Sequence, residues 1–122
     1  MVLQTLYLIP EGTVFSNGVG AEDDDDWCVI TLRTKQPIRV VLSYSDEEYG
    51  VKDLFLPWVW LLHCGEELNH EWAFGFTIED AVRGLLFDFI AVWDCYVNED
   101  EFNLTKGAIE FRETLKEFFE VA

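Results

Sequence analysis

Basic residues are scarce in this chain, and their scarcity excludes several kinds of partner. Only 8 of the 122 residues are Lys or Arg, against 24 Asp or Glu, so the formal net charge is −16. Binding to nucleic acid or to an anionic membrane surface depends on clustered Lys and Arg, and we expect neither here. A charge of this size favours a basic protein partner, weak binding of cations, or simply high solubility.

Cysteines and long apolar runs are also few. The three cysteines, Cys28, Cys64 and Cys95, are odd in number and lack CxxC spacing, which argues against a disulfide framework or a structural zinc site. The longest apolar run, residues 54–62, is too short to span a bilayer as a helix. The N-terminal residues carry no basic segment ahead of their apolar stretch, so no signal peptide is predicted. We predict a soluble, cytoplasmic protein.

Catalytic signatures are missing. The chain contains no GxGxxG or Walker A motif, and Gly18-Val-Gly20 precedes acids rather than a helix with a Lys. With so many acids, carboxylate pairs such as Glu79/Asp80 and Asp88/Asp94 arise by chance. We therefore predict that the protein is not an enzyme and uses no cofactor or metal.

Apolar and aromatic residues, in contrast, are abundant. Half of the residues are hydrophobic and 16% are aromatic, which excludes general disorder. At this length the chain is expected to form a single domain, residues 1–122, with one core.

The N-terminal half carries the strand signals. Residues 2–9 are apolar and β-prone and end in a turn at residues 10–12. Residues 27–33 and 38–44 flank residues 34–37, which predicts an antiparallel hairpin with a four-residue connection.

The apolar run at residues 54–62 contains Pro57, which is tolerated in the first turn of a helix. We predict a helix from near Pro57 to near Cys64-Gly65, with a buried strand as the alternative, and an irregular segment over residues 66–76.

Two further helices are predicted. Residues 77–97 have apolar positions at the three-and-four spacing of a helix, with Thr77 as N-cap. The last helix is expected over residues 105–120, capped by Asn103 or Thr105. The predicted fold is α+β: a small antiparallel sheet of three or four strands in the N-terminal half, covered on one face by about three helices in the C-terminal half.

Acidic residues form the candidate binding surface. Glu110, Glu113, Glu117 and Glu120 share one side of the last predicted helix, about one turn apart, which approximates the spacing of phosphates along a nucleic-acid strand. The alternative is an ordinary solvated helix face. Predicted loops add three more acidic clusters: Glu22, Asp23, Asp24, Asp25 and Asp26; Asp46, Glu47 and Glu48; and Glu99, Asp100 and Glu101.

The run of five acids at residues 22–26 lacks the alternating ligands and the Gly of an EF-hand loop. It predicts low-affinity binding of cations and no specific calcium site.

Two smaller groups of residues are further candidate sites. Trp72 and Phe74 lie in the segment predicted to be irregular and are candidate aromatic anchors in an acidic surround. His63, Cys64 and His70 could serve a cysteine- or metal-dependent hydrolase. Their spacing matches no closed zinc pattern, and no oxyanion-hole motif accompanies them, so a buried Cys64 at a helix end is the simpler interpretation.

Together these features predict a small acidic inhibitor that occludes the active or nucleic-acid-binding surface of a basic protein such as a nuclease. Toxin-immunity proteins are of this general type in size and charge, and so are phage or plasmid anti-defence proteins that imitate DNA. The resemblance is one of class and carries no residue across. Concentration of the acids in loops and on one helix face favours the immunity role. The alternatives are the anti-defence role, a small hydrolase, and a structural adaptor whose acidity serves solubility.

Overall fold

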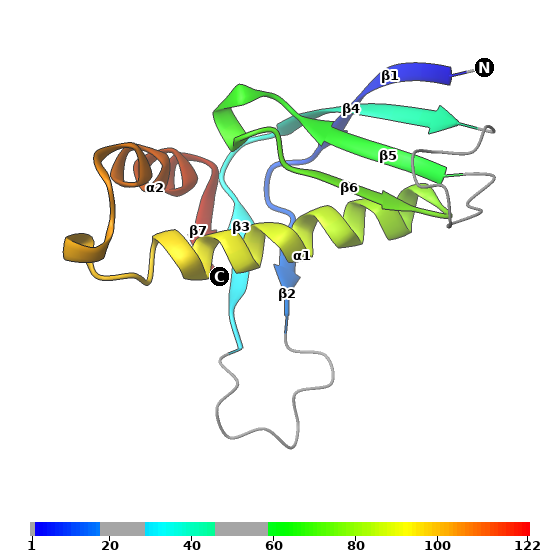
Figure 1. The fold of residues 1–122 in the computed structure, drawn as a ribbon. Coiled ribbons are helices and arrows are strands. Elements are labelled where there is room, and N and C mark those ends of the chain that lie inside the picture. The colour runs from blue at the N-terminus through cyan, green and yellow to red at the C-terminus, as the bar shows by residue number, and fades with distance from the viewer. Residues whose placement is uncertain (1, 18–28, 46–58) are drawn as a thin grey trace, which may run out of the picture. The chain divides into compact units, whose positions relative to one another are not determined.

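The computed structural model describes residues 2–17, 29–45 and 59–122 (Figure 1). In chain order the elements are β1 (Val2–Ile9), β2 (Val14–Ser16), β3 (Thr31–Thr34), β4 (Ile38–Ser45), β5 (Val59–Cys64), the 3₁₀ turn η1 (Glu66–Leu68), β6 (Trp72–Gly75), α1 (Ile78–Tyr96), the 3₁₀ turn η2 (Glu101–Asn103), α2 (Lys106–Phe118) and β7 (Phe119–Val121).

The chain divides into two compact units, each with its own antiparallel sheet. Unit 1 comprises residues 1–8 and 39–85 and contains a four-stranded sheet in the order β1-β4-β5-β6. Unit 2 comprises residues 9–38 and 86–122 and contains a three-stranded sheet in the order β2-β3-β7. Whether the whole chain behaves as a single domain stays a prediction.

In unit 1 alternate residues of the strands face the core. The register pairs Val40 with Cys64 and Leu42 with Leu62 across β4 and β5, and all four side chains are buried. The first part of α1 packs against the core-facing side of β6. A Cβ at Gly75 would lie 2.6 Å from the backbone nitrogen of Ala81, so this close approach of strand and helix requires a residue without a side chain.

In unit 2 the core centres on Phe119 of β7. Its ring contacts those of Phe15 and Phe89, with centroids 5.8 and 5.0 Å away. Strand β7 pairs with β3 and forms the third strand of the sheet β2-β3-β7. Phe89 and Phe119 are buried and Phe15 is half-buried, so these rings supply a large apolar area for so small a sheet.

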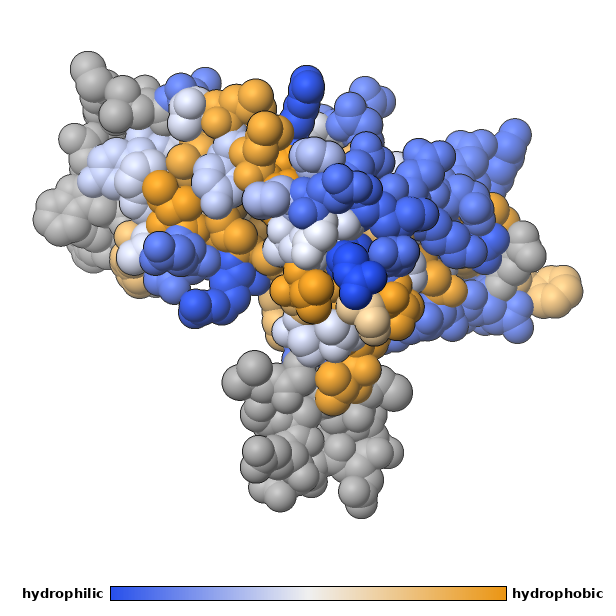
Figure 2. Space-filling model, turned by 180° about the vertical axis from the view of Figure 1, so that it is seen from behind, coloured by the Kyte–Doolittle hydropathy of each residue, from blue (hydrophilic) through white to orange (hydrophobic). Residues whose placement is uncertain are grey.

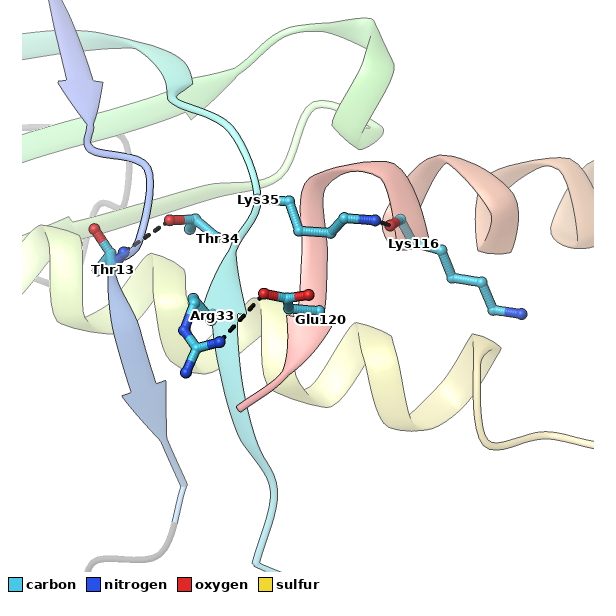
Figure 3. A network of polar contacts seen from close by, with 6 residues as sticks. All are labelled: Thr13, Arg33, Thr34, Lys35, Lys116 and Glu120. Atoms are coloured by element: carbon cyan, nitrogen blue, oxygen red, sulfur yellow. Dashed lines mark hydrogen bonds and ion pairs between the residues drawn. The ribbon is translucent and has the colours of Figure 1, made fainter.

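Polar contacts join neighbouring segments of unit 2 to one another (Figure 3). The hydroxyl of the buried Thr34 accepts a hydrogen bond from the Thr13 backbone nitrogen (2.9 Å) and donates one to the Pro10 carbonyl (2.8 Å). The Lys35 ammonium donates to the backbone carbonyl of Lys116 (2.9 Å), one of the carbonyls that the end of a helix leaves without an intrahelical partner. The Arg33 guanidinium pairs with Glu120 at 3.3 Å.

Several predictions are confirmed. The class is α+β, and the first strand and both C-terminal helices lie within one or two residues of their predicted bounds. The Thr77 hydroxyl accepts a hydrogen bond from the Asp80 backbone nitrogen, and the Thr105 hydroxyl accepts one from that of Ala108. Both helices therefore begin with a side-chain N-cap.

The predicted number and layout of elements is wrong. The described residues contain two α-helices rather than about three, and seven strands in two sheets rather than one sheet of three or four. Residues 59–64 form strand β5 instead of the end of a helix, and β6 lies in the segment predicted to be irregular. A short apolar run has no period that separates a strand from a buried helix, and here the strand alternative was correct.

The predicted hairpin is also wrong. Strand β3 pairs with β2 and β7, whereas β4 joins β1 and β5 in the other sheet. The residues at positions 35–37 therefore pass between sheets instead of closing a turn. Alternation identifies the faces of a strand but leaves its pairing partner undetermined.

Candidate functional site

The structure differs in two ways from the predicted row of four glutamates on the last helix. Glu110, Glu113 and Glu117 lie exposed on α2, but α2 ends at Phe118 and Glu120 belongs to β7. Glu113 contacts Arg112 (3.4 Å) and Lys116 (3.9 Å), and Glu120 pairs with Arg33.

Within the part of the chain that the structure describes, Glu110 and Glu117 have no ion-pair partner. They lie two helical turns apart, about 10 Å along the axis. The row is thus shorter and less charged than the sequence predicted.

Two of the loop clusters, residues 22–26 and 46–48, lie outside the described residues. The third cluster belongs to the turn between α1 and α2, residues 98–103, which we call the acidic turn. Glu99 and Asp100 are exposed there. Glu101 begins η2, and its side chain is outside the described part of the chain.

Hydrogen bonds define the shape of the acidic turn. One carboxylate oxygen of Glu99 accepts from the Asp100 backbone nitrogen (3.2 Å) and from the Asn103 side-chain amide (2.9 Å). The Asp100 carboxylate accepts from the Phe102 backbone nitrogen at 3.1 Å, and the Asn98 amide donates to Asp94 at 2.9 Å. Glu99 and Asp100 therefore fix the backbone of the turn while their side chains stay exposed.

The acidic turn presents one aromatic side chain. Phe102 is 97% exposed, the highest exposure among the large hydrophobic residues of the described chain. From position 84 to position 105 the sequence contains no Lys or Arg, so the surroundings of Phe102 in the sequence are entirely acidic or neutral. An aromatic anchor within a charged rim is a common arrangement in protein interfaces.

Phe102 is not among the site residues predicted from the sequence. A single aromatic residue between two helices adds to neither a helical nor a strand period. The available signal was local: three consecutive acids in a predicted turn are expected at the surface, and they favour exposure of the residue that follows them.

Trp72 and Phe74 lie on β6, at the edge of the four-stranded sheet, and are 52% and 49% exposed. Their rings stack with centroids 6.2 Å apart. None of the residues in β1, β4, β5 and β6 is Asp or Glu, and Glu71 directly precedes Trp72 in the sequence. A role for the pair as anchors of a basic partner stays a prediction.

Cys64 and the two nearby histidines do not form the arrangement that a hydrolase needs. Cys64 is 1% exposed, and burial, followed by the charges of Glu71 and Glu67, raises the pKa of its thiol from 9.0 to about 12. A thiol kept protonated is a poor nucleophile. His63 and His70 are exposed and stack on each other, with ring centroids 5.6 Å apart.

Two carboxylates on α1, Asp80 and Asp88, belong to the chance pairs noted in the sequence. Asp80 pairs with Arg83 at 3.6 Å, one helical turn away, and burial raises the pKa of Asp88. Over the described ranges, no group of three or more His, Cys, Asp or Glu side chains is placed to hold a metal ion. None of the helices in those ranges is both long and apolar enough to cross a membrane.

Comparison of this chain with protein-family models, with curated protein sequences and with solved structures found no match.

Proposed function

We propose that this protein is an acidic inhibitor that binds a basic, nucleic-acid-acting protein and covers its active or nucleic-acid-binding surface. A toxin-immunity role is the form we favour, with a nuclease toxin as the partner. The anti-defence role is the alternative, in which the partner is a nucleic-acid-binding defence protein. The two roles share one physical mechanism and differ in the identity of the partner.

The observation that carries the proposal is the fully exposed Phe102 on the acidic turn. Exposure of a large aromatic ring to water is unfavourable, and single exposed apolar residues are common. Phe102 differs from those in its setting, since hydrogen bonds to the carboxylates of Glu99 and Asp100 fix the backbone of the turn that displays it. A turn whose backbone is ordered before binding loses less conformational freedom when the complex forms.

Charge and apolar contact have different tasks in this mechanism. The net charge of −16 attracts a basic protein over a distance and speeds the encounter. Glu110 and Glu117 can pair with the partner's cations without first breaking an ion pair of their own. Phe102 then fills an apolar pocket on the partner and slows dissociation.

The test is capture followed by inhibition. The tagged protein is incubated with lysate of its native host at low salt, and the bound proteins are identified by mass spectrometry. We expect a basic nucleic-acid-acting protein in a one-to-one complex, whose activity on nucleic acid falls to background when the chain is added in equimolar amount. If no basic protein is recovered, or if the recovered protein keeps its activity, the proposal is wrong.

A variant pair tests the anchor. Phe102→Ala should weaken binding to the captured protein by at least about tenfold. Phe87→Ala is the matched control, because Phe87 is 50% exposed on α1 and lies outside the acidic turn. Equal affinities for the two variants would remove Phe102 from the mechanism.

A further inference from the structure

The connection between β5 and β6 brings together the two histidines of the chain, which we call the histidine pair. His63 stands on the outer face of the four-stranded sheet, opposite Val41 of β4 and Trp72 of β6 in the register. His70 lies in the connection itself, and the two exposed imidazole rings have centroids 5.6 Å apart and planes 15° apart. Figure 2, which views the molecule from behind, shows hydrophobic side chains gathered over this sheet and hydrophilic ones beside them.

The backbone holds His70 in a left-handed conformation. Its φ is +56°, and Asn69 before it has a φ of +59°, in a region that residues other than glycine seldom adopt. The His70 backbone nitrogen donates to the Gly65 carbonyl at 3.0 Å. The Cys64 backbone nitrogen donates to the Glu71 carbonyl at 2.8 Å and closes the connection. A backbone conformation of this kind, held by its surroundings, is frequent at functional sites.

The separation of the two rings suits one metal ion between them. A transition metal such as zinc lies about 2.0–2.1 Å from an imidazole nitrogen and hence about 3.2 Å from the ring centroid. The centroids of two imidazoles on one ion are then about 4.5 Å apart at an angle of about 90° at the metal, and about 6.4 Å apart at about 180°. The observed 5.6 Å falls inside this interval. Because both rings are exposed, each can turn a nitrogen towards a shared ion without displacing a core side chain.

The charge around the histidine pair is mostly negative. The connection contains Glu66, Glu67 and Glu71. The charges of Glu71 and Glu67 contribute to the raised pKa of the Cys64 thiol, so both carboxylates lie near the end of β5. Arg39 is the one Lys or Arg in the four strands of this sheet. A cation therefore meets more attraction than repulsion here.

We propose that His63 and His70 bind one divalent transition-metal ion of the kind that prefers nitrogen ligands, such as Ni²⁺ or Zn²⁺. Imidazole suits zinc, copper and nickel, whereas carboxylate and water oxygens suit magnesium and calcium. The described part of the chain has no group of three ligating side chains, so water or a donor atom of another molecule fills the other coordination positions.

This site replaces the expectation from the sequence that the chain uses no metal, because the spacing of the two histidines in the chain does not reveal that the fold brings them together. The buried Cys64 faces the core and is not one of the ligands. The site is independent of the proposed function, since neither the acidic turn nor α2 contributes a residue to it.

The experiment titrates NiCl₂ into the purified full chain, without a histidine tag, by isothermal titration calorimetry at neutral pH. We expect one ion per chain. His63→Gln and His70→Gln each remove one of two ligands and should each weaken binding by at least about tenfold. Glu117→Gln, which removes an exposed carboxylate from α2, is the matched control and should leave the affinity unaltered. CaCl₂ in equal concentration should not displace the Ni²⁺.

Thermal unfolding gives a second readout. An ion that binds the folded chain stabilises it by mass action, so about 1 mM NiCl₂ should raise the unfolding midpoint of the wild type and not that of either histidine variant. Circular dichroism without metal establishes that each variant is folded, and either variant makes the test if the other does not fold. Absence of Ni²⁺ binding by the wild type overturns the proposal. Equal affinity of the wild type and a folded histidine variant, or displacement by Ca²⁺, overturns it too, because carboxylates would then hold the ion.

Discussion

At the scale of single residues, burial rather than sequence spacing determines what the reactive groups can do. Cys64 lies in a stretch that suggests chemistry, between His63 and two glutamates, yet its side chain points into the core of unit 1 beside Val40 in the register. Its partner histidines stack on the outside. Successive residues of a strand face opposite sides of the sheet, so His63 and Cys64 cannot share a site.

The thiol of Cys64 should be protected from alkylation in the folded protein. At neutral pH we expect iodoacetamide to modify Cys64 at least about a hundredfold more slowly than the exposed Cys95, as read by peptide mapping. In urea the two rates should become similar. Rapid modification of Cys64 in the folded chain would show that the thiol is accessible and would restore it as a candidate nucleophile.

The same raised pKa links Cys64 to stability at high pH. The folded protein keeps the thiol protonated up to about pH 12, whereas the unfolded chain loses the proton near pH 9.0. The unfolded state therefore binds fewer protons between these values, and the free energy of unfolding falls as the pH rises. This contribution is fully present below pH 9.0. Between pH 9.0 and about pH 12 the free energy of unfolding, measured with urea, should therefore fall more steeply in the wild type than in Cys64→Ala, in which only the other titrating groups contribute.

The Thr34 hydroxyl provides a further prediction at the scale of single residues. Thr34→Val keeps the shape of the side chain but leaves the Thr13 backbone nitrogen without its acceptor. We expect the free energy of unfolding to fall by about 1–3 kcal/mol. Thr31→Val, the same change on the same strand at a half-buried hydroxyl with no hydrogen bond in the described chain, should stay within about 0.5 kcal/mol of wild type. Similar losses for both variants in urea denaturation would contradict this account.

At the scale of elements, the sequence predicted those parts whose signals are local. Helix α1 has a long three-and-four period, and Thr77 and Thr105 sit three residues before the nitrogens they cap. Those features depend only on neighbours in the chain. Strand β1 was found for the same reason, since a β-prone run ends at the turn around Gly12, whose φ of +82° suits glycine.

Features that depend on distant partners were not predictable from one sequence. From the sequence, strand β3 could equally have paired with β4, but in the structure it pairs with β2 on one side and with β7 on the other. Residues 119–121 continue the pattern of α2 in the sequence, yet Phe119 leaves the helix to join the core with Phe15 and Phe89. Tertiary burial outweighs helix propensity at that point. Phe102 was missed because exposure is a property of the fold, not of a period.

The junction of β6 and α1 provides a prediction at this scale. Gly75→Ala forces a methyl group against the backbone of Ala81 and should lower the free energy of unfolding by about 1–3 kcal/mol or more. Gly107→Ala is the control with the opposite sign, because no atom lies within 4 Å of the new methyl group in α2 and the helix gains about 0.5–1 kcal/mol. A neutral Gly75→Ala in thermal or urea unfolding would mean that strand and helix are not in close contact there.

At the scale of the whole molecule, charge is distributed unevenly over the secondary structure. The four strands of unit 1 contain no acid, whereas the acidic turn and the exposed side of α2 contain six. The acidic surface is the one that we propose meets a basic protein.

The central claim is that charge attracts this protein to a basic, nucleic-acid-acting partner, and the association rate with the captured partner tests it most directly. Stopped-flow mixing should show the association rate constant falling by about tenfold or more between about 0.05 M and about 0.5 M NaCl, with a much smaller change in the dissociation rate. An association rate that does not change with salt would contradict the claim and leave the acidity of the chain as a means of staying in solution.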